Sequence, residues 1–372
     1  MKRLLACAGV VLLCQVLSSA VAGDTNLGGY GELHFNKPLE KGSEGQLDFH
    51  RFVLFTSHQF ADWVWMYSEL EIEHTYLEGG ESTGELALEQ AYIQLQYAKA
   101  FSLRAGIMLV PVGIVNPLHE PPVFNGVERP NVERTIIPST WRESGIGAVG
   151  SFAGGLKYEG YVMAGLDPLG LSGANGIRGA RQKAFESSTA NWALTGRLDY
   201  MPFLGGSAGI SGFYSTLGGS IDGPASDSRF WMLSAHALYS RGNLTARGLV
   251  AYSEISDIGA LNDYLRFELA DPDVQVGEIQ LGMYAEMAYD FLGLLDPESE
   301  QRLFVFARLE RYDTHAATSG FAANPDYDRR ETTLGLTYLP VPQVCLKMDV
   351  QLLRTGGDNS REQLNLGVGY NF

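Results

Sequence analysis

Cysteine is scarce in this sequence: the chain has three, at positions 7, 14 and 345. The first two lie in an N-terminal segment that we expect to be removed, which leaves Cys345 alone. A single cysteine forms no internal disulfide and supplies no cysteine-based metal site. The chain is also poor in positive charge, with a formal net charge of −16 at pH 7. It therefore lacks the basic surface that nucleic-acid binding requires, and we expect no such partner.

Long hydrophobic runs are missing beyond residue 22. No stretch of about 18 apolar residues occurs there, which excludes a transmembrane helix from the rest of the chain. Helical periodicity of useful length, linkers and low-complexity tracts are missing as well, which indicates one domain.

The N-terminus has the three parts of a secretory signal peptide. A short positive segment at residues 2–3 precedes an apolar run at 4–17, and an A-x-A cleavage pattern follows at 20–22. A membrane-anchoring helix is the alternative, and the polar and small residues that end the run disfavour it. We predict a Sec-type signal peptide over residues 1–22, cleaved after the last of them, and one mature domain over residues 23–372.

What the chain has in abundance is alternation of apolar and polar residues with period two. Val344, Leu346 and Met348 share one face of a segment, whereas Lys347 and Asp349 share the other. Segments of this length cross a bilayer when tilted, and 44 glycines with 11% aromatic residues suit such a structure. The segments lie near 26–36, 47–58, 63–76, 85–97, 101–109, 142–152, 156–165, 191–201, 207–216, 229–239, 244–253, 275–290, 301–312, 329–339, 343–354 and 363–372.

The connections between these segments alternate in length. Gaps such as 59–62, 98–100 and 340–342 are short, whereas those at 110–141 and 166–190 are long and polar. Short turns at one end and long loops at the other are typical of outer-membrane barrels, and soluble sandwiches have no reason to sort their loops in this way. The sequence therefore predicts an all-β fold, a 16-stranded antiparallel transmembrane β-barrel.

The last segment carries an apolar face to the end of the chain. Leu364, Leu366, Val368, Tyr370 and Phe372 alternate with polar or glycine residues. On a soluble surface this face would leave an exposed hydrophobic edge. It is similar to the terminal signature of outer-membrane proteins, which the barrel-assembly machinery recognises. We predict location in the bacterial outer membrane, in contact with lipid and lipopolysaccharide, and pairing of residues 364–372 with 27–35 to close the barrel.

The third long connection, residues 110–141, is rich in proline and in charges of both signs. Proline fixes φ and stiffens a loop, and long ordered loops in compact domains are usually functional. In general porins the third loop folds into the barrel and narrows the lumen. We expect the same inward fold here.

Several motifs in and around this loop resemble the phosphate-selective porin O/P-like family. They are Gly29-Tyr-Gly-Glu32, Ser68-Glu-Leu-Glu-Ile-Glu-His74, Gly106-Ile-Met-Leu-Val-Pro-Val-Gly113, His119-Glu-Pro-Pro-Val-Phe-Asn-Gly126, Arg129-Pro130, Ile137-Pro-Ser-Thr-Trp-Arg-Glu143, Gly176-Ile-Arg-Gly179 and the segment from Arg308 to Thr314. The resemblance spans most of the mature chain. It implies a sixteen-strand porin that assembles as a homotrimer.

The resemblance and the charge pattern together predict a water-filled channel for passive diffusion of small polar or ionic solutes, with ion transport among its tasks. Phosphate-selective members are expected to carry a ladder of Arg and Lys in the pore. Here the third segment instead points Glu69, Glu71 and Glu73 to its polar face. A substrate-specific anion channel of the phosphate type is therefore the alternative rather than the first reading.

Fixed charges in a narrow pore set which ions enter. Candidate residues at the constriction are Glu120, Glu128, Arg129, Glu133 and Arg134. Candidate residues on the lumenal wall are Glu69, Glu71, Arg104, Arg142, Arg197 and Arg247. Loop acids facing wall arginines would produce a transverse field. Pairing across strands is the structural alternative for each charge.

Two functions of other classes remain open. Ser234 and His236 share a face of one segment, which a barrel-embedded hydrolase could use for catalysis. Residues two apart share a face in any strand, however, and a catalytic triad needs a third partner. A structural or adhesive barrel is the third reading. The histidines are scattered without metal-ligand spacing, so we expect no catalytic residue, metal or cofactor.

Overall fold

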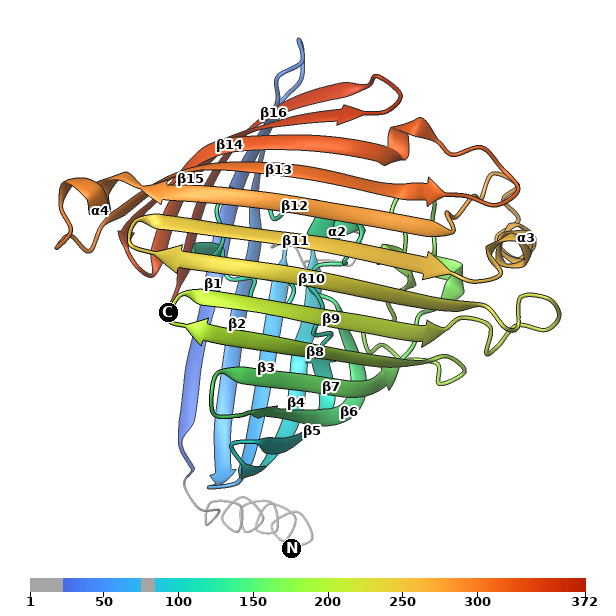
Figure 1. Cartoon of the computed structure of the whole chain (residues 1–372), viewed down its shortest axis with the longest axis horizontal. Helices are drawn as coiled ribbons and strands as arrows, with labels where there is room; N and C mark the ends of the chain where they lie inside the picture. The colour runs from blue at the N-terminus through green and yellow to red at the C-terminus, as the bar shows by residue number, and fades with distance from the viewer. Residues whose placement is uncertain (1–22, 75–83) are drawn as a thin grey trace, which may run out of the picture.

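The computed structural model describes residues 23–74 and 84–372, and in it sixteen strands close into one antiparallel barrel (Figure 1). Each strand pairs with its neighbours in sequence, and β1 pairs with β16 to close the sheet. The strands are β1 (Thr25–Pro38), β2 (Gln46–Ala61), β3 (Val64–Glu73), β4 (Glu85–Ala98), β5 (Phe101–Leu109), β6 (Arg142–Ser151), β7 (Leu156–Ala164), β8 (Trp192–Phe203), β9 (Gly206–Thr216), β10 (Arg229–Arg241), β11 (Leu244–Ile255), β12 (Ile279–Asp290), β13 (Arg302–Ala317), β14 (Asp328–Val341), β15 (Val344–Thr355) and β16 (Ser360–Asn371). The predicted fold class and strand number are confirmed.

The predicted signal peptide, residues 1–22, lies outside the described residues. Within the described part, no helix combines the length and the hydropathy that a membrane crossing requires.

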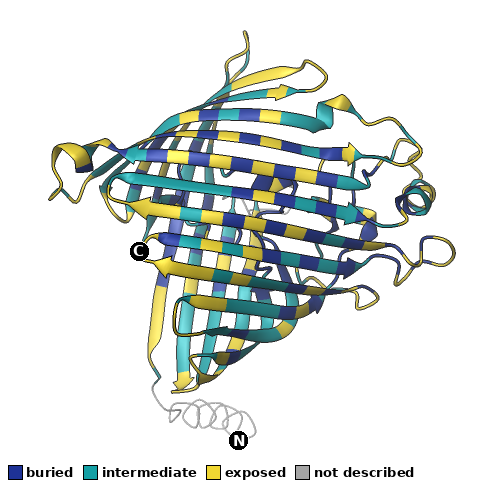
Figure 2. Cartoon of the chain, in the orientation of Figure 1, coloured by how far each residue is buried: buried dark blue, intermediate teal, exposed yellow. Residues whose placement is uncertain are grey.

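The alternation of polar and apolar residues in the sequence corresponds to the inner and outer faces of the barrel wall. On β12, Gln280, Tyr284 and Glu286 are buried, whereas Met283 and Met287 are exposed. Figure 2 shows this alternation along β10, β12 and β13. The outward face of the wall is apolar, which is the pattern of a barrel with a hydrocarbon-facing exterior. The inward face carries polar side chains and, where loop 3 packs, apolar ones such as Phe213.

The last strand closes the barrel in a register close to the predicted one. Leu364 pairs with Lys37 rather than with Phe35, a shift of two residues, and the backbone of Phe372 exchanges both hydrogen bonds with Gly29. Because side chains alternate with period two, a shift of two keeps every residue on its predicted face.

Short turns join the strands at one end and long loops at the other, as the sequence predicts. The expectation of no useful helix is wrong in one loop: α3 (Ile258–Glu268) lies between β11 and β12. Its buried positions Ile258, Leu261 and Leu265 follow helical spacing, a signal confined to three turns. A shorter helix, α4 (Phe291–Leu295), lies in the turn after β12.

Loop 3, residues 110–141, forms part of an internal hydrophobic core. It contains α2 (Val132–Thr135), which lies against β12 and β13 (Figure 1). Ile136, Ile137 and Trp141 are fully buried, and the ring of Trp141 lies 4.4 Å from that of Phe213 on β9. One side of the barrel interior is therefore filled by the loop. Open space inside is left toward β1–β3 and β14–β16.

Candidate functional site

Loop 3 crosses the barrel and is held by carboxylates of the opposite wall. Asp349 Oδ2 on β15 accepts a hydrogen bond from the backbone N–H of Val127 at 2.6 Å, and Glu310 Oε2 on β13 accepts one from that of Val132 at 3.0 Å. The side chain of Asn125 donates to Glu286 at 3.0 Å. These bonds hold residues 125–132 of loop 3 against buried side chains of β12, β13 and β15.

A glycine of the last strand makes room for the loop. A Cβ atom at Gly369 would lie 2.4 Å from the Cβ of Pro121, which is closer than two carbon atoms can approach. Glycine at this position thus allows the loop to lie directly against β16.

Glu133, a predicted constriction residue, is enclosed by the loop instead of facing an aqueous space. Its carboxylate accepts hydrogen bonds from the backbone N–H groups of Ile114 and Val115, each at 2.7 Å, and from the Tyr284 hydroxyl at 2.6 Å. Burial raises the pKa of Glu133, while the hydrogen bonds from Tyr284 and the two amides oppose that rise. Its position makes Glu133 an anchor between the two ends of loop 3 and the wall.

A cavity of about 480 Å³ remains between loop 3 and the wall formed by β1–β3 and β14–β16. Three predicted constriction residues line it, namely Glu128, Arg129 and Arg134, whereas Glu120 and Glu133 do not. The other polar residues of its lining are Glu32, His34, Asn36, Gln46, His50, Arg51, Glu73, His74, Asn131, Ser139, Thr140, Arg178, Glu331, Gln351, Arg361 and Gln363. The cavity is therefore lined by mixed charges that come from both the loop and the wall.

The loop acid at this cavity is already paired. Glu128 Oε1 accepts a hydrogen bond from Asn36 at 2.9 Å and lies 3.3 Å from His34 Nδ1. Burial would raise the pKa of Glu128, but the contacts with His34 and Asn36 prevail and lower it to about 2. Its negative charge is thus largely offset by the wall.

The loop arginines at the cavity are not paired in this way. In residues 23–74 and 84–372, no carboxylate lies within 4.0 Å of the guanidinium group of Arg129, Arg134 or Arg178. Arg178, from loop 4 (residues 165–191), donates to the backbone oxygen of Arg134 at 3.1 Å. Burial and the nearby Arg181 and Arg134 lower the pKa of Arg178 to about 10. Positive charge is therefore concentrated where loops 3 and 4 meet.

The predicted wall arginines lie inside the barrel, and each is engaged in an ion pair. The shortest nitrogen–oxygen distances are 3.7 Å for Arg104 with Glu159, 3.7 Å for Arg142 with Glu89, 2.6 Å for Arg197 with Asp199 and 3.1 Å for Arg247 with Glu286. Arg197 also donates to the backbone oxygen of Gly113, and Arg247 to that of Val123. These arginines connect strands to each other and to loop 3, and none lines the cavity.

The predicted wall acids lie in a buried cluster. Glu69 accepts a hydrogen bond from Gln90 at 2.6 Å, and Glu71 accepts one from Arg51 at 3.0 Å. Arg51 also lies 2.7 Å from Glu32. Apolar residues occupy both faces of the strand around Arg51, so alternation alone does not assign its side chain to the inside or the outside. The structure buries Arg51 inside the barrel, and a register irregularity lies next to it, where Glu32 pairs with Arg51 and Leu33 pairs with Phe49.

Sequence reasoning missed several charged residues of the interior. Arg308 is fully buried and lies 2.8 Å from Glu310 and 3.4 Å from Glu286. It also donates to the backbone oxygens of Asn125 and Glu128 in loop 3. Its place on the polar face of β13 was a signal that could have found it.

The histidines, scattered in sequence, form clusters in space. Asp48 Oδ2 lies 3.3 Å from His50 Nδ1 and 2.7 Å from His74 Nδ1. A second cluster joins His119 of loop 3 to Glu69 and Glu89. The expectation that no metal-ligand grouping exists was drawn from linear spacing, which says nothing about residues on neighbouring strands.

His236 has an acidic partner that the sequence did not place. Its Nε2 lies 3.0 Å from Asp199 Oδ1 and 2.9 Å from Arg197. The Ser234 hydroxyl is buried and has no hydrogen-bond partner among the described residues. A hydrolytic triad needs the histidine to bridge the serine and the acid, and this arrangement lacks the serine contact.

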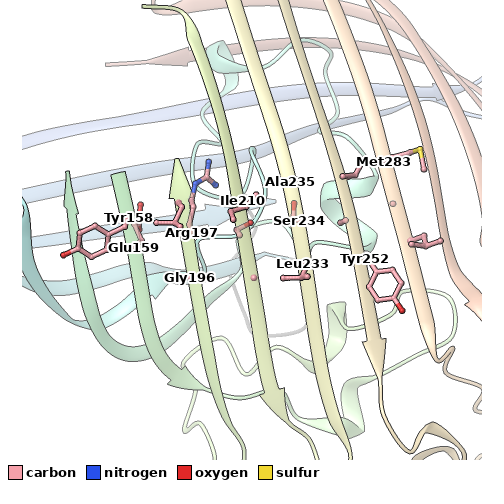
Figure 3. A pocket seen from close by; sticks show the side chains of 17 residues that line it. Tyr158, Glu159, Gly196, Arg197, Ile210, Leu233, Ser234, Ala235, Tyr252 and Met283 are labelled. Atoms are coloured by element: carbon pink, nitrogen blue, oxygen red, sulfur yellow. The ribbon is translucent and has the colours of Figure 1, made fainter. Parts of the chain in front are cut away.

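A hollow of about 730 Å³ lies on the outer face of the barrel (Figure 3). Its lining includes the exposed side chains of Ile210, Leu233 and Met283, and Gly196 and Gly212 form part of its floor. An apolar surface of this kind suits hydrocarbon rather than a polar solute. The polar cavity beside loop 3 is therefore the candidate functional site.

Known structures share this fold across nearly the whole chain. An anion-selective porin from Comamonas acidovorans matches with a TM-score of 0.61 and 14% identity, over 94% of this chain and 100% of that one. Salmonella typhi OmpF matches with a TM-score of 0.63 and 14% identity, over 94% of this chain and 98% of that one. The outer-membrane channel DcaP of Acinetobacter baumannii matches with a TM-score of 0.58 and 12% identity, over 94% of this chain and 98% of that one. The chain thus has the porin fold.

An uncharacterized protein of Aquifex aeolicus (strain VF5) is 35% identical over 334 residues, which are 87% of this chain and 74% of that protein. The chain belongs to the family of this Aquifex protein. No protein-family model matches the chain. The comparisons support a porin fold and do not identify the phosphate-selective porin O/P-like family.

Proposed function

We propose that the mature chain is an outer-membrane porin for passive diffusion of small polar or ionic solutes, with selectivity set by loop 3 and by charges of the lumen. The observation that carries this proposal is the cavity of about 480 Å³ that loop 3 leaves open along β1–β3 and β14–β16. Its charged lining suits hydrated solutes and disfavours apolar ones.

Diffusion through the barrel is tested with vesicles. The mature chain is reconstituted into liposomes, and swelling is followed with sugars and amino acids of increasing size. We expect swelling that slows steeply with solute size, because loop 3 narrows the passage. Absence of swelling in vesicles that contain folded barrel would contradict the proposal and favour the structural or adhesive reading. Release of acyl chains from the lipid would favour the hydrolase instead.

A preference for anions is the second candidate, and the arginines at the cavity favour it. Arg129, Arg134 and Arg178 have no carboxylate partner within the described residues, whereas Glu128 is paired. A concentration of unpaired positive charge attracts anions and repels cations inside a narrow passage. The fold neighbour from Comamonas acidovorans is described as anion-selective, which agrees with this sign. The phosphate-type channel is one member of this class.

The sign of selectivity is measured as the reversal potential in planar bilayers under a salt gradient. The wild type is expected to favour chloride over potassium. The double substitution Arg134→Gln and Arg178→Gln should lower the anion-to-cation permeability ratio several-fold, because it removes two charges from the cavity. Arg241→Gln serves as a matched control, since Arg241 is exposed at the opposite end of the barrel. An unchanged ratio in the double variant would exclude these arginines as the selectivity element.

Export and assembly complete the proposal. Residues 1–22 would act as a Sec-type signal, the barrel-assembly machinery would insert residues 23–372 into the outer membrane among lipid and lipopolysaccharide, and three copies would associate as a homotrimer. N-terminal sequencing of the mature protein and native mass spectrometry of the detergent-extracted barrel test the cleavage site and the trimer separately.

A further inference from the structure

Three potential metal ligands meet between loop 3 and the wall, and none of them lines the polar cavity. Glu69 comes from β3, Glu89 from β4 and His119 from loop 3. His119 Nε2 lies 3.6 Å from Glu69 Oε1 and 3.4 Å from Glu89 Oε2, and the three atoms lie within 4.8 Å of one another. All three residues are buried, with exposed fractions of 6%, 0% and 4%.

A β-bulge places Glu89 in this cluster. Glu69 pairs with Gln90 and the next residue, Leu70, pairs with Leu88, so Glu89 is an extra residue in β4. Glu89 is buried, and Gln90, directly after it, donates a hydrogen bond to Glu69 Oε2 at 2.6 Å. A bulge lets two consecutive side chains point to one face, and bulges recur where a side chain must be re-aimed. Here it adds a carboxylate and holds Glu69.

His119 is oriented for coordination. Its Nδ1 lies 3.1 Å from the backbone oxygen of Asn116, a contact in which the ring N–H donates. This leaves Nε2 directed at the two carboxylates. A histidine that donates one ring N–H to a carbonyl and presents the other nitrogen is the usual arrangement of a metal ligand.

The cluster contains buried polar atoms that have ionic neighbours but, in the part of the chain that the structure describes, no hydrogen-bond partner. Within the described residues, the two carboxylate oxygens of Glu89 have no hydrogen-bond partner, and neither does His119 Nε2. The closest guanidinium, that of Arg142, lies 3.7 Å from Glu89 Oε1. Leaving buried charged groups unsatisfied is costly, and a bound cation between them removes that cost.

We propose that Glu69, Glu89 and His119 bind a divalent transition-metal ion, zinc by preference. With zinc bonds of about 2.1 Å, ligand atoms of a tetrahedral site lie roughly 3.4 Å apart, whereas those of an octahedral site lie roughly 3.0 Å apart. The two distances from His119 Nε2, 3.4 and 3.6 Å, are closer to the tetrahedral spacing, and the ligand atoms all lie within 4.8 Å of one another. One imidazole and two carboxylates form a set that zinc accepts.

Bound at this place, the ion would join loop 3 to the wall. His119 lies in the first third of loop 3, and Glu69 and Glu89 lie on adjacent strands. The rings of Tyr30 on β1 and His119 form a T-shaped pair with their centroids 5.9 Å apart. The ion therefore acts as a structural clamp, and the proposal stands whether or not the barrel conducts solutes.

The cluster of Asp48, His50 and His74 is a weaker candidate and provides a control. His50 Nε2 lies 2.7 Å from Arg51 Nη2, so it accepts a hydrogen bond and its Nδ1–H faces Asp48. A ring in this state has no lone pair left for a metal. Asp48→Asn should therefore leave metal binding unchanged.

The test uses the folded full-length mature barrel in detergent, treated with a chelator and then titrated with zinc chloride alone. Isothermal titration and elemental analysis give affinity and stoichiometry. We expect one zinc per chain for the wild type and for Asp48→Asn, and at least about tenfold weaker binding for Glu89→Gln and His119→Gln. Electrophoretic mobility without heating verifies that each variant is folded.

Cobalt substitution in the wild type provides a readout that needs no variant. Tetrahedral cobalt absorbs visible light far more strongly than octahedral cobalt, so an intense band that zinc displaces supports the site. Failure of the wild type to bind zinc would overturn the proposal. So would a weak cobalt band, or loss of binding in Asp48→Asn with retention in Glu89→Gln.

Discussion

At the scale of single residues, charged side chains inside the barrel link neighbouring strands to each other and to loop 3. Arg51, Arg197 and Arg308 each lie within 3.0 Å of a carboxylate, and Arg197 and Arg308 also donate to backbone oxygens of loop 3. Breaking a buried pair by removing one partner leaves an uncompensated charge, which costs far more than an exposed pair contributes. The arginines left without acids, at the polar cavity, are consequently the ones available to solutes.

The prediction at this scale concerns Glu133. Glu133→Ala would leave the backbone N–H groups of Ile114 and Val115 and the Tyr284 hydroxyl without their acceptor. Each buried donor left unsatisfied costs about 1–3 kcal/mol. We expect a lower free energy of unfolding in urea and a noisier single-channel current, since loop 3 loses its anchor. Glu120→Ala is the control; equal effects of the two substitutions would argue against the anchor role.

At the scale of elements, the strands were predictable and loop 3 was predictable only in outline. Period-two alternation located every strand to within a few residues, because each strand buries one face against the barrel interior. The proline-rich composition of residues 110–141 indicated an ordered loop. Which of its charges face the cavity was not predictable, because Glu128 and Glu133 meet partners on strands far away in sequence.

Loop 3 should control conductance. Replacing residues 121–127 with a short glycine-serine linker removes the contacts of Asn125 with Glu286 and of Val127 with Asp349. We expect a severalfold rise in single-channel conductance, because this part of the loop spans the barrel interior. The same linker in the first loop, residues 39–45, should leave conductance unchanged. A variant of residues 121–127 that conducts like the wild type would show that the loop does not limit flow.

At the scale of the whole molecule, the barrel depends on its closure. β1 and β16 are the chain's first and last strands, and their pairing leaves the sheet without a free edge. A barrel open at this seam would expose unpaired backbone groups to hydrocarbon, where no water can satisfy them.

Removal of residues 364–372 should therefore abolish assembly rather than weaken it. The truncated chain would lose all but one of the β1–β16 pairs, including the exchange between Gly29 and Phe372. We expect no heat-modifiable band on electrophoresis and no outer-membrane fraction. The substitution Phe372→Ala, which keeps the backbone pairs, should fold in detergent and slow insertion in cells. Folding of the truncated chain to a heat-modifiable species would contradict this.

The sequence by itself determined the strands, their faces and the sorting of short turns and long loops, because these follow from local alternation and turn chemistry. Only the tertiary structure decided which charges meet. Register between strands determines three features of the interior: the bulge at Glu89, the pairing of Arg51 and the cluster of His119 with two carboxylates. The spacing of residues along the sequence does not specify this register. For the same reason the polar cavity, which loop 3 forms with β1–β3 and β14–β16, was identified only in the closed barrel.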